Sequence, residues 1–122
     1  MASKKKENST NHLNNTVITQ CPVSFTLDKI GGRWKTLILY KLKKGPLRYG
    51  QLKKQIPLIT EKMLAQQLRE LEADKLIHRD AKPVVPPHVE YYLTKQGKDM
   101  SPIFVAMAKW GQKNNPEYQN CK

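Results

Sequence analysis

The sequence is poor in acidic residues and cysteines, and it contains no long apolar run. Ten acidic residues stand against 22 Lys and Arg, which gives a formal net charge of +12 over 122 residues. So basic a chain favours a polyanionic partner, with nucleic acid as the first candidate and an anionic membrane surface as the second. No apolar run approaches the ~20 residues of a spanning helix, so we expect a soluble, cytoplasmic protein without a membrane segment or signal peptide.

Cysteine and histidine are too sparse to indicate a metal centre or a disulfide framework. The two cysteines, Cys21 and Cys121, form no CxxC pair, and the three histidines are scattered. An enzyme would need a cluster of acids, bases or metal ligands, and the sequence shows no such spacing. We therefore expect no catalytic residues, no metal and no cofactor.

Composition divides the chain into one folded domain and two tails. Residues 1–20 are rich in Asn, Thr, Ser and Lys and lack periodicity, which predicts a flexible basic arm. The arm either touches phosphates or only aids solubility. Residues 21–112 carry the periodic apolar patterns of a single domain with a modest core, and residues 113–122 are expected to form a flexible tail.

The most informative stretch is TEKMLAQQLRELEAD, residues 60–74, which predicts a helix with Thr60 as its N-cap. At about 100° per residue, the leucines fall on one side of this helix. The opposite side carries cationic, amide and small residues suited to reading base edges in a DNA major groove. The candidate base contacts are Thr60, Lys62, Ala65, Gln66 and Arg69. Taken alone, the stretch also fits an ordinary amphipathic helix with a solvated face.

The segments before this stretch strengthen the DNA-binding interpretation. Helices are expected from Pro22 to Ile30, from Arg33 to about Leu42 and from Tyr49 to Ile56, and Pro46–Arg48 is a candidate edge strand. The turn Pro57–Ile59 then makes a helix-turn-helix. Residues 33–54 contain eight Lys or Arg and no acid, so this region can hold DNA phosphates.

A hairpin is expected after the helix-turn-helix. The two motifs together predict a winged helix, which is a mainly α fold with a small β-hairpin. Its strands are Leu76–Asp80 and Val89–Leu93, and the proline-rich segment 81–88 is the wing. Basic side chains of the hairpin reach a phosphate or the minor groove, or they are merely solvated. The candidate phosphate contacts of the whole domain are Arg33, Lys35, Arg48, Lys53, Arg79 and Lys82.

A final helix is expected after Thr94, with Pro102 either kinking it or restarting it behind Ser101. Its apolar stripe suggests a surface that pairs with a second subunit. Packing of this helix against the first helix within one chain is the compatible alternative. The candidate dimerisation residues are Val23, Leu27, Phe104, Met107 and Trp110, and the chain is expected to fray from Gly111.

Cys21 precedes Pro22 at the start of the first helix. A helix N-terminus favours the thiolate form of a cysteine and so raises its reactivity. An inert, half-buried thiol is the alternative at such a position.

Three segments in order resemble the HxlR family of bacterial transcription regulators, relatives of the MarR-type winged-helix proteins. They are CPVSFTLDKIGGRWKTLILYKL, GPLRYGQLKKQIPLITEKMLAQQLRELEADKLIHR and VVPPHVEYYLTKQG. The resemblance spans residues 21 to about 110. It implies a homodimer on a pseudo-palindromic operator, with dimer contacts from the first and last helices.

The resemblance also implies a role for the N-terminal cysteine, which senses quinones, diamide or other electrophiles in several members. Carried over, that residue is Cys21, with Cys121 as a candidate resolving thiol. Two departures stand out: Lys75 where the family usually has Gly, which suggests a different C-cap, and Gln51 where Glu is frequent.

We therefore expect a sequence-specific regulator that binds double-stranded DNA as a homodimer and responds to an electrophile or another small-molecule effector. The alternative is a non-specific or architectural nucleic-acid-binding protein without an effector.

Overall fold

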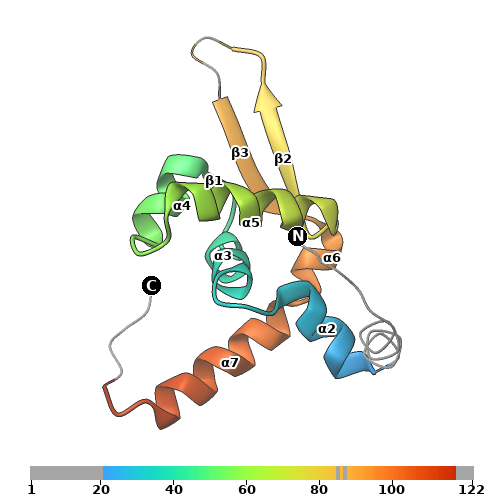
Figure 1. The fold of residues 1–122 in the computed structure, drawn as a ribbon, viewed down its shortest axis with the longest axis vertical. Helices are drawn as coiled ribbons and strands as arrows, with labels where there is room; N and C mark the ends of the chain where they lie inside the picture. The colour runs from blue at the N-terminus through green and yellow to red at the C-terminus, as the bar shows by residue number, and fades with distance from the viewer. Residues whose placement is uncertain (1–20, 85, 87, 118–122) are drawn as a thin grey trace, which may run out of the picture. The chain divides into compact units, whose positions relative to one another are not determined.

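The computed structural model describes residues 21–84, 86 and 88–117 (Figure 1). These residues belong to two compact units, the first ending at Gly31 and the second beginning at Gly32. The predicted N-terminal arm and Cys121 lie outside the described residues, so the expectations for them stay predictions.

The described part of the first unit is the helix α2, Pro22–Ile30. Cys21 is its N-cap and Pro22 occupies the first helical position, as predicted from proline's fixed φ and missing N–H. The Phe25 N–H donates to the Cys21 carbonyl at 2.7 Å, which closes the first turn. The Lys29 ammonium lies 5.4 Å from the centre of the Phe25 ring. The helix therefore begins where the Cys-Pro pair predicts it.

Three helices form the helix-turn-helix part of the second unit: α3 (Lys35–Leu42), α4 (Tyr49–Gln55) and α5 (Glu61–Ala73). The helix α3 starts two residues later than expected, with Trp34 as its N-cap. It packs against α4, α5 and α7 and against the sheet. Ile38, Leu39 and Leu42 are buried on this central helix, whereas Leu37 is only half-buried.

The sheet has three antiparallel strands in the order β1-β3-β2: β1 (Leu47–Arg48), β2 (Ile77–Lys82) and β3 (His88–Leu93). The expected edge strand is thus confirmed, because Leu47 pairs with Tyr91. The hairpin of β2 and β3 projects beyond α5 (Figure 1).

The hairpin strands are longer than the sequence suggests, and the wing is correspondingly shorter. Lys82 pairs with His88, so Ala81, Lys82 and His88 belong to strands rather than to the predicted wing 81–88. Pro83 follows the last pair directly, and a proline has no N–H to continue the ladder.

The chain closes with α6 (Lys95–Lys98) and α7 (Ser101–Asn114). The Thr94 hydroxyl accepts from the Gly97 N–H at 3.1 Å, which confirms the predicted N-cap. Pro102 lies in the first turn of α7, so the helix restarts there and is not kinked. The N-cap is Met100 and not Ser101, which already belongs to the helix. The Trp110 carbonyl accepts from the Asn114 side chain at 3.0 Å, and α7 stays helical past Gly111, where fraying was expected.

The C-terminus of α5 is closed by a Schellman motif around Lys75. The Leu76 N–H donates to the Leu71 carbonyl and the Lys75 N–H to the Glu72 carbonyl, both at 3.0 Å. Lys75 has φ 62°, the left-handed conformation that glycine adopts most easily. The expectation of a different C-cap is therefore wrong: the glycine-type cap forms, and lysine bears its steric cost.

We expect Lys75→Gly to raise the free energy of unfolding by about 1 kcal/mol, because it removes a Cβ from a left-handed residue. Urea unfolding of the purified variant measures this change. Lys75→Ala is the matched control, since it removes the same charge but keeps the Cβ and should gain little. Equal stabilisation by both substitutions would assign the effect to charge and contradict the strain.

Candidate nucleic-acid interface

The helix α5 has a buried face and an open face. Leu64, Leu68 and Leu71 are buried beneath it. Lys62 and Arg69 are exposed, and Ala65 and Gln66 are half-exposed. The predicted cationic and amide-bearing face is therefore accessible. The small side chain of Ala65 and the planar amide of Gln66 leave room for this face to approach a DNA groove closely.

Thr60 is the N-cap of α5, and its hydroxyl oxygen accepts from the Met63 N–H at 3.1 Å. This contact satisfies one of the helix's unpaired backbone donors. The capping contact occupies the Thr60 oxygen as an acceptor, and its hydroxyl proton remains able to donate to a base or phosphate.

Two side chains of α4 fasten the turn that leads into α5. The Tyr49 hydroxyl donates to the Glu61 carbonyl at 2.9 Å, and the Lys53 ammonium donates to the Pro57 carbonyl at 3.2 Å. Burial, aided by the charge of Glu61, raises the pKa of Tyr49, so its hydroxyl remains a donor. Lys53, predicted as a phosphate contact, thus also supports the turn.

A chain of polar contacts fixes Gln66 on the open face. The Gln66 side-chain amide donates to the Glu70 carboxylate at 3.1 Å. The same carboxylate forms an ion pair with the Lys35 ammonium of α3 at 2.7 Å. The Lys35 and Glu70 side chains are 14% and 34% exposed. Because the amide nitrogen faces a carboxylate, the Gln66 carbonyl oxygen is turned away and can accept from a base. Lys35 therefore helps to position α5, and its predicted role as a phosphate contact stays a prediction.

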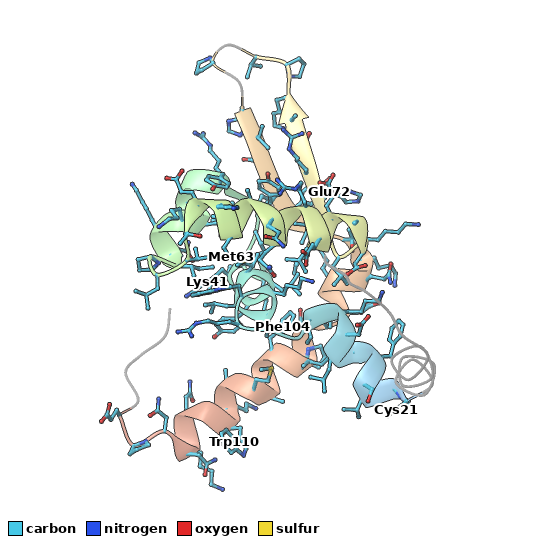
Figure 2. The ribbon with its side chains drawn as sticks, viewed as in Figure 1. Cys21, Lys41, Met63, Glu72, Phe104 and Trp110 are labelled. Carbon is cyan, nitrogen blue, oxygen red and sulfur yellow. The ribbon has the colours of Figure 1, made fainter. Side chains whose placement is uncertain are left out.

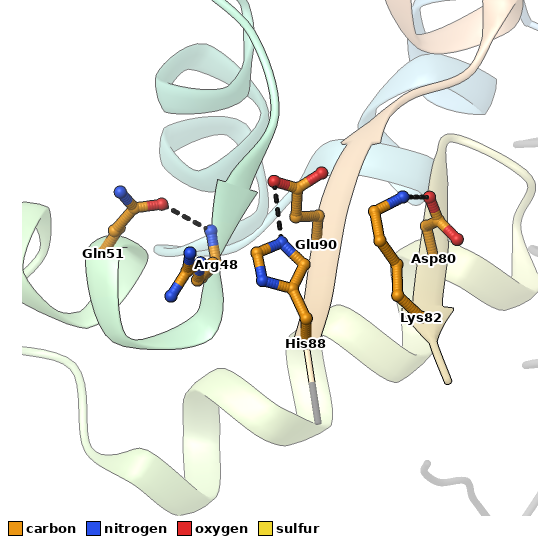
Figure 3. Close-up of polar contacts among 6 residues, drawn as sticks. All are labelled: Arg48, Gln51, Asp80, Lys82, His88 and Glu90. Carbon is orange, nitrogen blue, oxygen red and sulfur yellow. Dashed lines mark hydrogen bonds and ion pairs between the residues drawn. The ribbon is translucent and has the colours of Figure 1, made fainter. Parts of the chain in front are cut away.

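The wing strands carry a row of charged side chains (Figure 3). Glu90 of β3 pairs across to Arg48 on one side and Asp80 on the other. Lys82 contacts Asp80 at 2.8 Å, which raises the pKa of Lys82, and His88 contacts Glu90 at 3.0 Å. Neighbouring acids thus offset much of the hairpin's positive charge on this face.

Arg79 lies on the other face of the hairpin, because side chains alternate along a strand. It pairs across to Tyr91, whereas Asp80 pairs with Glu90. Arg79 and Lys82, both predicted as phosphate contacts, consequently point to opposite sides of the wing.

Arg48 and Arg33 are exposed, as phosphate contacts must be. The Arg48 N–H donates to the Gln51 side chain at 2.8 Å, which caps the first turn of α4 (Figure 3). Gln51 therefore supplies this cap without the negative charge that a glutamate would bring. The Arg33 guanidinium lies 5.0 Å from the centre of the Trp34 ring.

The predicted dimerisation residues divide into exposed and buried ones. Val23 and Leu27 of α2 and Met107 of α7 are exposed, and Trp110 is 70% exposed. Phe104 is 1% exposed and belongs to the core, so it has almost no surface left for a partner. Figure 2 shows Phe104 toward the start of α7 and Trp110 on its outer half. The helical spacing of the apolar residues could not predict that Phe104 is buried and Trp110 exposed.

The Cys21 thiol is exposed and free. Contacts with the Ser24 N–H and hydroxyl, and with the Val23 N–H, lower its pKa below the usual value. These are the open donors of the helix N-terminus, which favour a thiolate. Exposure and a lowered pKa favour a reactive thiol over an inert one, and the reactivity of Cys21 stays a prediction.

The sequence analysis missed two positioning residues, Tyr49 and Glu70. The four-residue spacing of Gln66 and Glu70 was a usable signal, since such pairs are neighbours on a helix. The partner lysine on α3 gave no local signal.

The fold is that of a winged-helix DNA-binding protein, because it combines a helix-turn-helix, a three-stranded sheet and the exposed face of α5. Residues 29–119 match the HxlR-like helix-turn-helix family, to which the chain belongs. The HTH-type transcriptional regulators YdeP and YybR of Bacillus subtilis (strain 168) are similar. YdeP is 50% identical over 93 residues, 76% of this chain and 73% of YdeP. YybR is 48% identical over 94 residues, which are 77% of this chain and 75% of YybR. The chain is accordingly a transcriptional regulator and not an enzyme.

Solved structures of similar proteins agree with this family assignment. The redox regulator HypR in its oxidised form has a TM-score of 0.75 and 47% identity, covering 78% of this chain and 98% of that one. The reduced form of the transcriptional regulator YodB from B. subtilis has a TM-score of 0.68 and 33% identity. The match covers 81% of this chain and 98% of the YodB chain. Among the described residues, no helix is long and apolar enough to cross a membrane.

We expect the Lys35–Glu70 pair to stabilise the fold in a pH-dependent way. The hydrogen bond with Lys35 lowers the pKa of Glu70 below 4.5, so its contribution is present above that pH and is lost as pH falls through the folded-state value. Glu70→Gln should therefore cost up to about 1 kcal/mol near neutral pH, and much less at an acid pH at which Glu70 of the folded protein is protonated.

Urea unfolding at both pH values measures this cost, and Lys35→Met provides the double-mutant cycle. In the Lys35→Met background, Glu70→Gln should have little further effect. A cost that is the same at both pH values would contradict the ion pair.

Proposed function

We propose that this regulator acts in the cytoplasm as a homodimer that recognises a pseudo-palindromic operator through α5. One observation carries the proposal: the open face of α5 combines Lys62, Gln66 and Arg69 with a helix held in place from α3 and α4. Arginine and lysine suit guanine, and a glutamine whose amide orientation is fixed suits adenine. Rigid support of such side chains is what sequence reading requires, whereas non-specific binding needs only charge.

The dimer places two α5 helices in successive major grooves, about 34–36 Å apart or a multiple of that. The exposed apolar side chains of α2 and α7 support this assembly, because Val23, Leu27, Met107 and Trp110 would otherwise remain in water. Arg33 and Arg48 hold phosphates on the flanks. Ala65 and Thr60 lie near the groove floor.

The test is a titration of the protein into the duplex upstream of its own gene and into a scrambled duplex at two salt concentrations. We expect Arg69→Ala to lose about 1–3 kcal/mol on the operator and little on scrambled DNA, because it removes a base contact. The exposed Arg48 is the matched comparison: Arg48→Ala should weaken both duplexes alike and reduce the salt dependence.

Equal losses on both duplexes for Arg69→Ala would reject the base contact. Salt-sensitive binding of the wild-type protein to every duplex tested, without a bounded footprint, would favour the architectural alternative.

We further infer that Cys21 makes operator binding responsive to thiol-reactive compounds. Its exposure, its lowered pKa and the similarity to the redox regulator HypR support this. An electrophilic quinone would form a covalent bond with the Cys21 thiolate. Diamide, a two-electron thiol oxidant, would join Cys21 and a second thiol as a disulfide while it is itself reduced to the hydrazine. Cys121 is the proposed second thiol.

We expect Cys21→Ser to abolish the change in operator affinity that quinone and diamide cause. Cys121→Ser is the control: it should keep the quinone response, which needs one thiol, and lose the diamide response. Gel-shift titrations with and without each compound measure both. An unchanged quinone response in Cys21→Ser would eliminate this position as the sensor.

A further inference from the structure

Leu58 has the highest exposed fraction, 80%, of the large apolar side chains among the described residues. It lies in the turn between α4 and α5, two residues before Thr60, the N-cap of α5. A single exposed leucine is ordinary on a protein surface, so its meaning depends on where it lies and on what surrounds it. Both point to a contact that none of the candidate base-contacting residues supplies.

The turn holds Leu58 outward from both sides. Before it, the Lys53 ammonium donates to the Pro57 carbonyl at 3.2 Å. After it, the Ile59 N–H donates to the Ile56 carbonyl at 3.3 Å, and the Ile59 side chain is 1% exposed and anchored in the core. The backbone that carries Leu58 is therefore already ordered, so this side chain can meet a partner without a further loss of backbone freedom.

The surroundings of Leu58 are mainly cationic. Residues 53–62 carry one acid, Glu61, and three lysines, Lys53, Lys54 and Lys62. Lys54 and Lys62 are exposed. Such a rim attracts a polyanion and disfavours a second copy of a chain whose net charge is +12. The partner that Leu58 meets is therefore an apolar group on a polyanionic surface.

In a helix-turn-helix, the N-terminal end of the second helix approaches the base edges in the major groove. The apolar group that bases present there is the C5-methyl of thymine. We propose that Leu58 contacts the methyl group of one thymine in each half-site and so helps to determine the sequence that is bound. This inference rests on the proposed operator recognition by α5. It adds an apolar contact to a face that otherwise reads bases by hydrogen bonds.

Replacing thymine by deoxyuridine tests the contact, because it removes only the methyl group. Selection from a random duplex pool first gives the preferred site of the wild-type protein, and each thymine of that site is then replaced in turn. In gel-shift titrations, we expect one replacement in each half-site to weaken wild-type binding about fourfold, the loss for one buried methyl group. Leu58→Ala should bind the thymine duplex about fourfold more weakly and lose nothing further at that replacement.

Two matched variants separate the apolar contact from side-chain size. Leu58→Met keeps an apolar side chain of similar volume and should retain the dependence on the methyl group. Leu58→Asn keeps nearly the shape of leucine but is polar, and it should lose this dependence. Arg69→Ala is the control for weakened binding: its affinity should fall while the same deoxyuridine replacement still costs about fourfold. Circular dichroism checks the folding of each variant.

Each opposite result has its own meaning. If the wild-type protein binds its selected site specifically but no replacement weakens it, or if Leu58→Ala stays as sensitive as the wild type, the contact is overturned and the proposed function stands. Equal weakening by Leu58→Ala on selected and scrambled duplexes would assign Leu58 to the sugar–phosphate backbone and overturn the inference. So would a dimer that Leu58→Ala dissociates in sedimentation. A selection without any common sequence would reject the proposed function together with this inference.

Discussion

The burial of α3 is the constraint on which the second unit depends. Ile38 and Leu39 have no exposed surface, and this helix contacts α4, α5, α7 and the sheet. Truncating such a leucine or isoleucine to alanine typically costs about 2–5 kcal/mol, a large part of the stability of a domain this small. Within the second unit, α4, α5, α7 and β3 are thus positioned against one short helix, and a displacement of α3 reaches all of them.

Support for the reading helix comes from a few directed polar contacts on this apolar base. Tyr49 and Lys53 donate to backbone carbonyls around the turn, and Lys35 reaches Glu70. Each contact is worth about 1 kcal/mol or less for folding. Their larger effect is on recognition, because side chains that are already ordered lose less conformational entropy on binding.

Local chemistry made most of the fold predictable from the sequence. Pro22, Thr60 and Thr94 start helices through contacts within a few residues, and Gly31 follows the last residue of α2. Non-local contacts were not predictable: Lys35 and Glu70 are far apart in sequence, and the burial of Phe104 depends on its neighbours in space. Lys75 shows a further limit, since the fold imposes a left-handed residue there regardless of its side chain.

The same contacts change how the large positive charge should be understood. Of the six candidate phosphate contacts, Lys35, Lys53 and Lys82 have partners within the described chain, whereas Arg33, Arg48 and Arg79 are exposed arginines. Each phosphate neutralised on duplex DNA contributes about 0.9 to the salt slope. A lysine held by a carbonyl or carboxylate adds to the net charge but must give up that contact before it can bind a phosphate. Net charge therefore indicates the kind of partner, and the internal contacts determine which cations meet it.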